Sequence, residues 1–179
     1  MINLFQPSLG DEELALIKDV FTSNWLGKGN GVKDFESKFA TSLSSNSESF
    51  LSTTSCTEAI FLSAKLFNFS KSDEIIVPTI SFPSVGSAVI ESGAKIVFCD
   101  VDKHSLNVRA EDIQKAISNK TKAVYITHYG GIPCEMDEII ELCSQNKILV
   151  IEDSACAVRS FYKGKACGTI GDMGMWSFD

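Results

Sequence analysis

Short apolar runs rich in β-branched residues alternate with longer segments of helical periodicity along most of this chain. The apolar runs predict strands at 74–77, 95–99, 123–127, 148–151 and 173–178. Between them, apolar residues at helical spacing predict helices at 55–67, 83–91, 110–117 and 136–145. Strands that alternate with helices of about ten residues require crossover connections and a largely parallel, buried sheet. We therefore predict an α/β fold with a mostly parallel central sheet and flanking helices.

The N-terminal part of the chain predicts a different organisation. Apolar residues share one helical face over 11–21 and again over 32–43, which predicts two amphipathic helices. The stretch N-W-L-G-K-G-N-G at 24–31 predicts a glycine-rich loop between them. A short strand is predicted at 49–53, directly before the helix that Ser55 opens.

Composition narrows the class of protein. The chain has 179 residues, 44% apolar and 22% charged, as expected of one globular domain with a sizeable core. Its net charge of −7 argues against non-specific binding to nucleic acid or to anionic membranes. We find neither a secretory signal nor an apolar run approaching the roughly 20 residues that span a bilayer. The six cysteines form no C-x-x-C pair and no metal-ligand spacing, so we expect a reduced, cytoplasmic protein without a metal site.

The stretch K-I-L-V-I-E-D-S-A-C-A at 147–157 is the strongest indication of a site. Its apolar run predicts a buried strand, which ends abruptly in Glu152 and Asp153. Open α/β sheets bind their ligands at the carboxyl ends of their strands, where these two carboxylates would lie. A solvated acidic turn is the ordinary alternative, and the other strand ends decide between the two.

A phosphate site is indicated by T-T-S-C-T at 53–57, which leaves the predicted strand and opens a helix. The free N–H groups of a first helical turn, the helix dipole and the hydroxyls of Ser55 and Thr57 together suit a phosphate group. An ordinary helix cap by Ser or Thr is the alternative. The segment is not a P-loop, because G-x-x-x-x-G-K is absent.

Two ring-bearing residues follow other predicted strands. Phe82, just past the strand at 74–77, is either a core or loop aromatic or a plate stacked on a flat cofactor. His128, in H-Y-G-G, is either structural or part of the site, whereas His104 lies in a polar turn and is expected at the surface. A carboxylate, an aromatic ring and a phosphate-binding helix start on one edge fit pyridoxal phosphate, with Asp153 paired to the protonated ring nitrogen.

Six motifs, taken in order, also carry a resemblance to a known family. They are F-E-x-K-F-A (35–40), S-C-T-E-A-I (55–60), D-E-I-I-V-P-T-I-S-F (73–82), T-K-A-V-Y-I-T-H-Y-G-G (121–131), V-I-E-D-S-A (150–155) and Y-K-G-K-A-C-G-T-I-G-D-M-G-M-W-S-F (162–178). In this order they resemble the DegT/DnrJ-type nucleotide-sugar aminotransferases, which are pyridoxal-phosphate enzymes of aspartate-aminotransferase fold type I. The resemblance covers almost the whole chain.

The resemblance implies roles for individual residues. It places Asp153 on the pyridine nitrogen and Phe82 against the ring. His128 is a second catalytic candidate because of its own position after a predicted strand. The residues that it implies on the phosphate side are Cys56, Thr57 and Ser177, beside Ser55, whose hydroxyl at the helix start already suits a phosphate. Cys56 stands where many members have Gly, a variation that leaves the binding amide in place.

Three further residues are implied near the ligands. Cys156 lies where the family commonly has Gln or His near the cofactor's ring hydroxyl, so we assign it to the cofactor side. Trp25 and Lys28, in the glycine-rich loop, are candidates for the substrate side. A solvated loop is the equally weighted alternative for these two.

The resemblance also implies something about domain organisation. In the family, the lysine that forms the Schiff base lies five residues after the serine matched by Ser177, which is three residues beyond Asp179. We therefore expect 1–179 to be the N-terminal part of a longer enzyme, containing most of the large cofactor-binding domain. The Schiff-base lysine segment and the small C-terminal domain would follow it, and the chain alone should lack turnover.

The implied activity is transfer of an amino group, from glutamate, to a ketone carbon of a nucleotide-linked sugar in polysaccharide biosynthesis. A homodimer is expected, because fold type I sites are usually built at a subunit interface. A sugar dehydratase of the same fold, with His in place of the lysine, stays open, as does a non-catalytic regulatory or sugar-sensing protein. A nicotinamide-dependent oxidoreductase fits the α/β pattern, but G-x-G-x-x-G is missing after the first strand.

Overall fold

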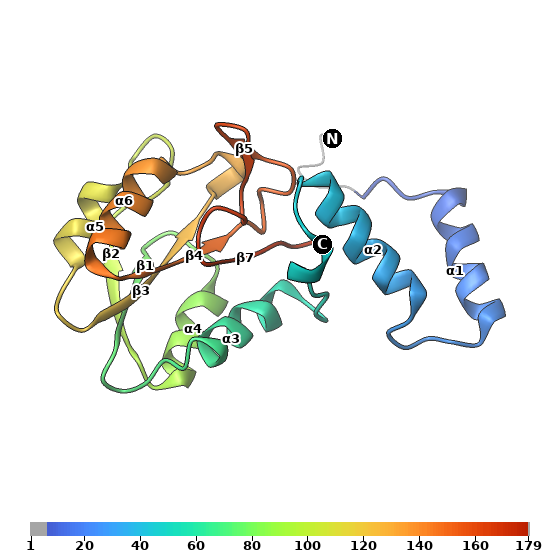
Figure 1. The fold of residues 1–179 in the computed structure, drawn as a ribbon, viewed down its shortest axis with the longest axis horizontal. Coiled ribbons are helices and arrows are strands. Elements are labelled where there is room, and N and C mark those ends of the chain that lie inside the picture. Colours follow the sequence, from blue (N-terminus) through green and yellow to red (C-terminus); the bar gives the residue numbers. More distant parts are fainter. Residues whose placement is uncertain (1–6, 179) are drawn as a thin grey trace, which may run out of the picture.

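The computed structural model describes residues 7–178 and has a five-stranded parallel sheet at its centre (Figure 1). The strands are β1 (Glu74–Pro78), β2 (Lys95–Cys99), β3 (Thr121–Thr127), β4 (Leu149–Asp153) and β7 (Met173–Met175). They lie in the order β2-β1-β3-β4-β7, and each neighbouring pair is parallel. The predicted α/β class is thereby confirmed.

Helices cover both faces of this sheet, as the figures show. They are α3 (Cys56–Leu66), α4 (Pro83–Ser92), α5 (Ala110–Ala116) and α6 (Met136–Asn146). Successive strand residues point to opposite faces, so each strand contributes to two cores. Tyr125 and Ile151 pack with α3 and α4 in one core, whereas Ile126 and Val150 pack with α5 and α6 in the other. Within residues 7–178, no helix is long and apolar enough to cross a membrane.

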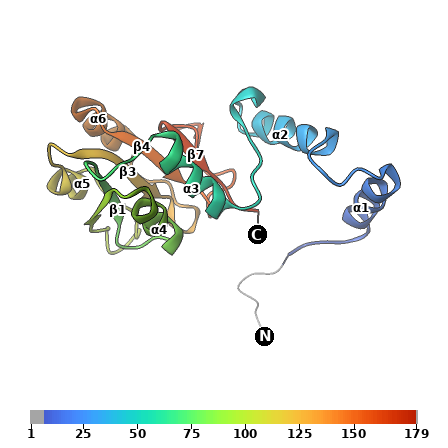
Figure 2. The same ribbon diagram turned by 90° about the horizontal axis from the view of Figure 1, so that it is seen from below.

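The N-terminal elements lie beside the sheet. They are α1 (Asp11–Ser23), α2 (Asn30–Ser42) and the 3₁₀ turn η1 (Ser47–Ser49). Figure 2 shows α1 standing clear of the sheet, and none of its residues is buried. The exposed residues of its apolar stripe are Leu14, Ile17, Val20 and Phe21. The two predicted amphipathic helices are confirmed, but the apolar face of α1 has nothing to pack on within this part of the chain.

The prediction of a strand at 49–53 is wrong, because the structure has no strand there. Asn46 accepts a hydrogen bond from the backbone N–H of Glu48 and so favours η1. The chain then runs extended, but the N–H of Ser52 donates to the Glu36 carboxylate, 2.7 Å away, instead of to a neighbouring strand. A local cap and a side-chain acceptor thus take up the groups that a sheet ladder would need.

The last predicted strand is shorter than 173–178. It ends at Met175 because the rings that follow leave the sheet and join an aromatic cluster. Trp176 lies 5.3 Å from the ring of Phe39 and 5.4 Å from that of Phe50, measured between centroids. Phe178 packs edge-on against Phe39 as well. The sequence pattern also missed a small antiparallel hairpin of β5 (Phe161–Tyr162) and β6 (Lys165–Ala166).

Candidate active site

The two neighbouring carboxylates at the end of β4 point to opposite faces of the sheet. Ile151 belongs to the core under α3 and α4, so Asp153, two residues on, projects toward the same side. Glu152 projects to the α5–α6 side. Asp153 also pairs in register with Thr127 on one neighbouring strand and with Met175 on the other. Only Asp153 therefore faces the helices whose N-termini carry the predicted phosphate and ring residues.

Asp153 is a buried carboxylate with spare hydrogen-bonding capacity. Its side chain is 2% exposed, and its Oδ1 accepts a hydrogen bond from the N–H of Ala155 at 3.1 Å. No other described residue donates to it. Burial raises the pKa of Asp153, and the hydrogen bond from the Ala155 N–H and the nearby His128 only partly oppose this. Such a carboxylate suits a cationic N–H donor, and the protonated ring nitrogen of pyridoxal phosphate is a group of that kind.

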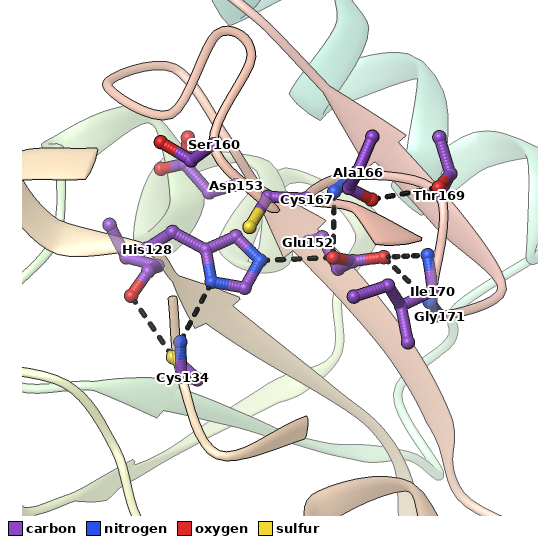
Figure 3. A network of polar contacts seen from close by, with 12 residues as sticks. His128, Cys134, Glu152, Asp153, Ser160, Ala166, Cys167, Thr169, Ile170 and Gly171 are labelled. Atoms are coloured by element: carbon purple, nitrogen blue, oxygen red, sulfur yellow. Dashed lines mark hydrogen bonds and ion pairs between the residues drawn. The ribbon is translucent and has the colours of Figure 1, made fainter. Parts of the chain in front are cut away.

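Glu152 is the centre of a buried polar network (Figure 3). It is fully buried, and its Oε2 accepts hydrogen bonds from His128 Nε2 at 2.9 Å and from the N–H of Gly168 at 2.7 Å. Its Oε1 accepts from the N–H groups of Ile170 and Gly171 at 2.7 and 2.6 Å. Burial alone would raise the pKa of Glu152, but the bonds from His128, Gly171 and Gly168 outweigh it and lower the pKa.

His128 has both ring nitrogens occupied within this network. The N–H of Cys134 donates to Nδ1 at 3.0 Å, so Nδ1 is the acceptor and Nε2 carries the proton that points at Glu152. The ring is fully buried and follows β3 at the start of the 3₁₀ turn η2 (Tyr129–Gly131). In this geometry His128 holds Glu152, the residue next to Asp153, by a hydrogen bond. Its catalytic role stays a prediction.

Several buried hydroxyl groups at the same sheet edge have no partner. Ser84 near the start of α4, Thr127 at the end of β3 and Ser154 after β4 have side-chain oxygens without a hydrogen bond to any described residue. Thr127 lies beside Asp153 and on the same face. A buried hydroxyl without a partner costs free energy, so such groups gather where a ligand or water completes them. The sequence analysis had missed all three, because unpaired hydroxyls cannot be recognised from a pattern.

The start of α3 forms one wall of a cleft of about 610 Å³. Ser55 is the N-cap and its hydroxyl accepts the N–H of Glu58 at 3.1 Å, which is the ordinary capping geometry. Ser55 and Cys56 line the cleft, and Ser177, just after β7, lines it from the other side. The structure thus brings together three of the four predicted phosphate residues. Thr57 is exposed outside the lining.

Asp153 and the other predicted residues are not among those that line this cleft. Phe82 is the N-cap of α4 and its ring is 63% exposed, free to contact a ligand or another part of the protein. Cys156 is exposed in the loop after β4. Trp25 is 64% exposed, and Lys28 forms an ion pair of 3.0 Å with Glu36, which lines the cleft. His104 is exposed, as predicted.

Comparison with known proteins identifies relatives of this architecture. A model of the DegT/DnrJ/EryC1/StrS aminotransferase family matches residues 7–179. The chain is 46% identical over 179 residues to the dTDP-4-dehydro-2,3,6-trideoxy-D-glucose 4-aminotransferase of Saccharopolyspora spinosa, matching 100% of this chain and 46% of that protein. The chain spans about half the length of the curated relatives it matches.

Solved structures show the same fold. The crystal structure of the aminotransferase TlmJ from Streptoalloteichus hindustanus matches with a TM-score of 0.97 and 47% identity, over 100% of this chain and 49% of that one. The GDP-4-keto-6-deoxy-D-mannose-3-dehydratase of E. coli, solved with hydrated PLP, matches with a TM-score of 0.90 and 28% identity, over 98% and 47% of the two chains. The fold that the motifs implied is thereby confirmed.

Proposed function

Because the chain belongs to the DegT/DnrJ/EryC1/StrS aminotransferase family, we propose that its full-length protein is a pyridoxal-phosphate-dependent sugar aminotransferase. Its substrates would be a nucleotide-linked keto-sugar and glutamate as amino donor. The observation that carries the proposal is Asp153, a buried carboxylate with a single hydrogen bond at the carboxyl end of β4. A relative at 46% identity whose name specifies a 4-amino transfer to a dTDP-linked sugar supports the substrate class.

Different residues of this chain would bind different parts of the cofactor. Asp153 would hold the ring nitrogen and Phe82 would cover the ring, with Cys156 on the side of the ring hydroxyl. The phosphate would lie at the start of α3, against Ser55, the amides of Cys56 and Thr57, and Ser177 across the cleft. The partial positive charge of a helix N-terminus suits that anionic end of the ligand.

Bound pyridoxal phosphate supplies an electron sink for the carbon that gains or loses the amino group. Asp153 serves that chemistry by keeping a proton on the ring nitrogen, since its negative charge favours the cationic form of its partner. The lysine that the family resemblance places three residues beyond Asp179 would move the proton at the reacting carbon. The 179-residue chain alone should therefore lack turnover, and we assign none of its own lysines to this role.

The first test uses the full-length protein with added pyridoxal phosphate, followed by borohydride reduction and peptide mapping by mass. A reduced lysyl adduct in the peptide just after Phe178 is the result expected of an aminotransferase. Transfer of isotope-labelled nitrogen from glutamate to a nucleotide-linked keto-sugar would then establish the reaction and its donor. Failure of the protein to bind the cofactor would overturn the proposal.

A sugar dehydratase is the second candidate, favoured by the 28% identity and high structural similarity to the E. coli 3-dehydratase. The borohydride experiment separates the two. Cofactor that binds without forming a lysyl adduct, together with loss of a sugar hydroxyl instead of gain of nitrogen, would indicate the dehydratase. Cofactor and sugar binding without any turnover would indicate a regulatory protein on the same scaffold.

Assembly and location extend the proposal. A homodimer is expected from fold type I, and the exposed Phe82 ring and apolar stripe of α1 are compatible with further packing in the whole protein. Light scattering of the full-length protein would determine its oligomeric state, and fractionation of cells would test the cytoplasmic location.

A further inference from the structure

Glu152 has no role in the proposed chemistry, although it immediately precedes Asp153 and is fully buried. A buried carboxylate is costly unless its oxygens are satisfied, and here four donors at 2.6–2.9 Å satisfy them. Three of these donors are backbone N–H groups within one short segment, 168–171. Hydrogen bonds from N–H groups to an ionised carboxylate are among the stronger ones in proteins.

The segment 168–171 leads directly to the predicted phosphate side. It is followed by Asp172, whose N–H donates to the carbonyl of Val150 and whose Oδ2 accepts the Val150 N–H, both at 2.8 Å. The three residues of β7 come next, and Ser177 lies two residues beyond them. The position of Ser177 therefore depends on where the segment 168–171 is held.

The strand β7 is short and lies at one edge of the described sheet, where three residue pairs join it to β4. Met175 also packs in the core under α3 and α4. Close backbone contact helps, because Gly168 and Gly174 approach each other so nearly that a Cβ on Gly174 would overlap the carbonyl of Gly168. Trp176 closes this turn by donating from Nε1 to the carbonyl of Cys167 at 3.1 Å. The whole turn is thus anchored at its start by Glu152.

The opposite side of Glu152 reaches the loop after β3. His128 donates to Glu152 and accepts from Cys134, and Ser160 bridges to the carbonyl of Gly131 at 2.8 Å. Glu152 thereby joins the loop that follows β3 to the segment that precedes β7, and Ser160 separately joins the loop that follows β4 to that first loop. Asp153 is the next residue of the same strand, so its position is fixed together with that of Glu152.

We propose that Glu152 is a positioning residue that sets the distance between the ring-nitrogen site at Asp153 and the phosphate site at Ser177. It acts through the backbone N–H groups of Gly168, Ile170 and Gly171. This inference rests on the proposed function, because it assumes a ligand that spans both sites. The inference makes a specific prediction about the phosphate group. Asp153 alone provides the contact to the ring nitrogen, whereas Glu152 determines where the phosphate site at Ser177 lies relative to that contact.

The test compares the affinity of the full-length protein for pyridoxal phosphate with that for pyridoxal, which lacks the phosphate. In Glu152→Gln, an amide replaces one carboxylate oxygen and can no longer accept from all four donors. We expect the preference for the phosphorylated form to fall about tenfold or more. Asp153→Asn should weaken both ligands together and leave that preference unchanged, because it removes a ring contact.

Two controls separate positioning from general loss of stability. Glu74→Gln alters a carboxylate at the amino end of β1 that accepts from Ser118 and Lys95, and it should leave the preference as it is. Glu152→Asp keeps the charge but is shorter by one methylene, so it should shift the preference in the same direction by less. If Glu152→Gln does not fold, the ligand preference of Glu152→Asp is measured in its place.

Hydrogen exchange of the cofactor-free protein supplies a reading that does not involve the cofactor. Glu152→Gln should lose protection at the amides of Gly168, Ile170 and Gly171, with the core strands still protected. Unchanged preference for the phosphorylated ligand in Glu152→Gln would overturn the inference, even if those amides were exposed. Failure of the unaltered protein to bind pyridoxal phosphate would instead overturn the proposed function.

Discussion

At the scale of the residue, Glu152 and Asp153 are adjacent and both buried, yet their pKa values move in opposite directions. Burial raises both, but hydrogen bonds from His128, Gly171 and Gly168 reverse the effect at Glu152, whereas Asp153 accepts one hydrogen bond from the described residues. Glu152 is therefore a carboxylate already satisfied by the protein. Asp153 is a carboxylate that a ligand would complete, which is the property expected of a binding residue.

The lowered pKa of Glu152 predicts a dependence of stability on pH. A carboxylate whose pKa is lower in the folded state stabilises it above the unfolded pKa of about 4.3, and that contribution disappears as the pH falls through the folded value. The free energy of unfolding of Glu152→Gln should be lower than that of the unaltered protein by about 3 kcal/mol at pH 7. The gap should close below about pH 4, as urea titrations at several pH values would measure. A gap of constant size would contradict the assignment.

Asp153→Asn should have opposite effects on stability and on binding. Because the pKa of Asp153 is raised, its contribution to stability is lost as the pH rises through the folded value, and at pH 7 the ionised group opposes folding. The asparagine should therefore stabilise the cofactor-free protein at pH 7 by on the order of 1 kcal/mol. It should also weaken pyridoxal phosphate binding about tenfold or more. Thermal melts with and without cofactor would detect both changes, and a destabilised cofactor-free variant would contradict the account.

At the scale of the element, the sheet was predictable and the connections were not. Buried strands such as β3 and β4 are continuous apolar runs, and the helices between them have clear periodicity and stops, as at Gly93. The segment at 49–53 has the composition of a strand, but the N–H of Ser49 donates to the carbonyl of Asn46 and the N–H of Ser52 donates to the Glu36 carboxylate. The importance of Glu152 was likewise invisible, because three of its donors lie 16–19 residues further along the chain and the fourth, His128, lies 24 residues before it.

The tight turn that leads into β7 gives a prediction at this scale. Gly174→Ala would place a Cβ against the backbone of Gly168, which cannot move without breaking its bond to Glu152. We expect a loss of about 2–4 kcal/mol in the free energy of unfolding. Gly31→Ala is the matched control, since Gly31 lies in α2 with no atom near its added Cβ and alanine favours a helix. Equal effects of the two substitutions in denaturant titrations would argue against a close contact.

At the scale of the whole molecule, the chain divides into a packed α/β body and a less buried N-terminal region. Ile139 is completely buried in the body, whereas Ile17 in α1 is 50% exposed. The free edge of β7 and the stripe on α1 together leave apolar and hydrogen-bonding surface uncovered in the 179-residue chain. A chain with such surface should associate.

This division predicts unequal effects of two identical truncations in the 179-residue chain. Ile139→Ala should cost about 2–5 kcal/mol, because it leaves a cavity beneath α6. Ile17→Ala should change the free energy of unfolding by less than about 0.5 kcal/mol and reduce self-association measured by light scattering. A large loss of stability on truncating Ile17 would show that α1 packs on the body in solution.

The side chains of Glu152 and Asp153 point to opposite faces of the sheet, and this arrangement also protects β4 against pairing in the wrong register. A slip of β4 by one residue would exchange the two carboxylates between faces while the apolar residues behind them, Val150 and Ile151, differ by a single methylene. Hydrophobic packing alone would therefore discriminate poorly between the correct and the slipped arrangement. The slipped arrangement would, however, bury an unsatisfied carboxylate on one face and leave four donors empty on the other. Glu152 thus gives the correct register of β4 a lower free energy than the slipped one. The register of the strand and the placement of Asp153 therefore depend on the same side chain.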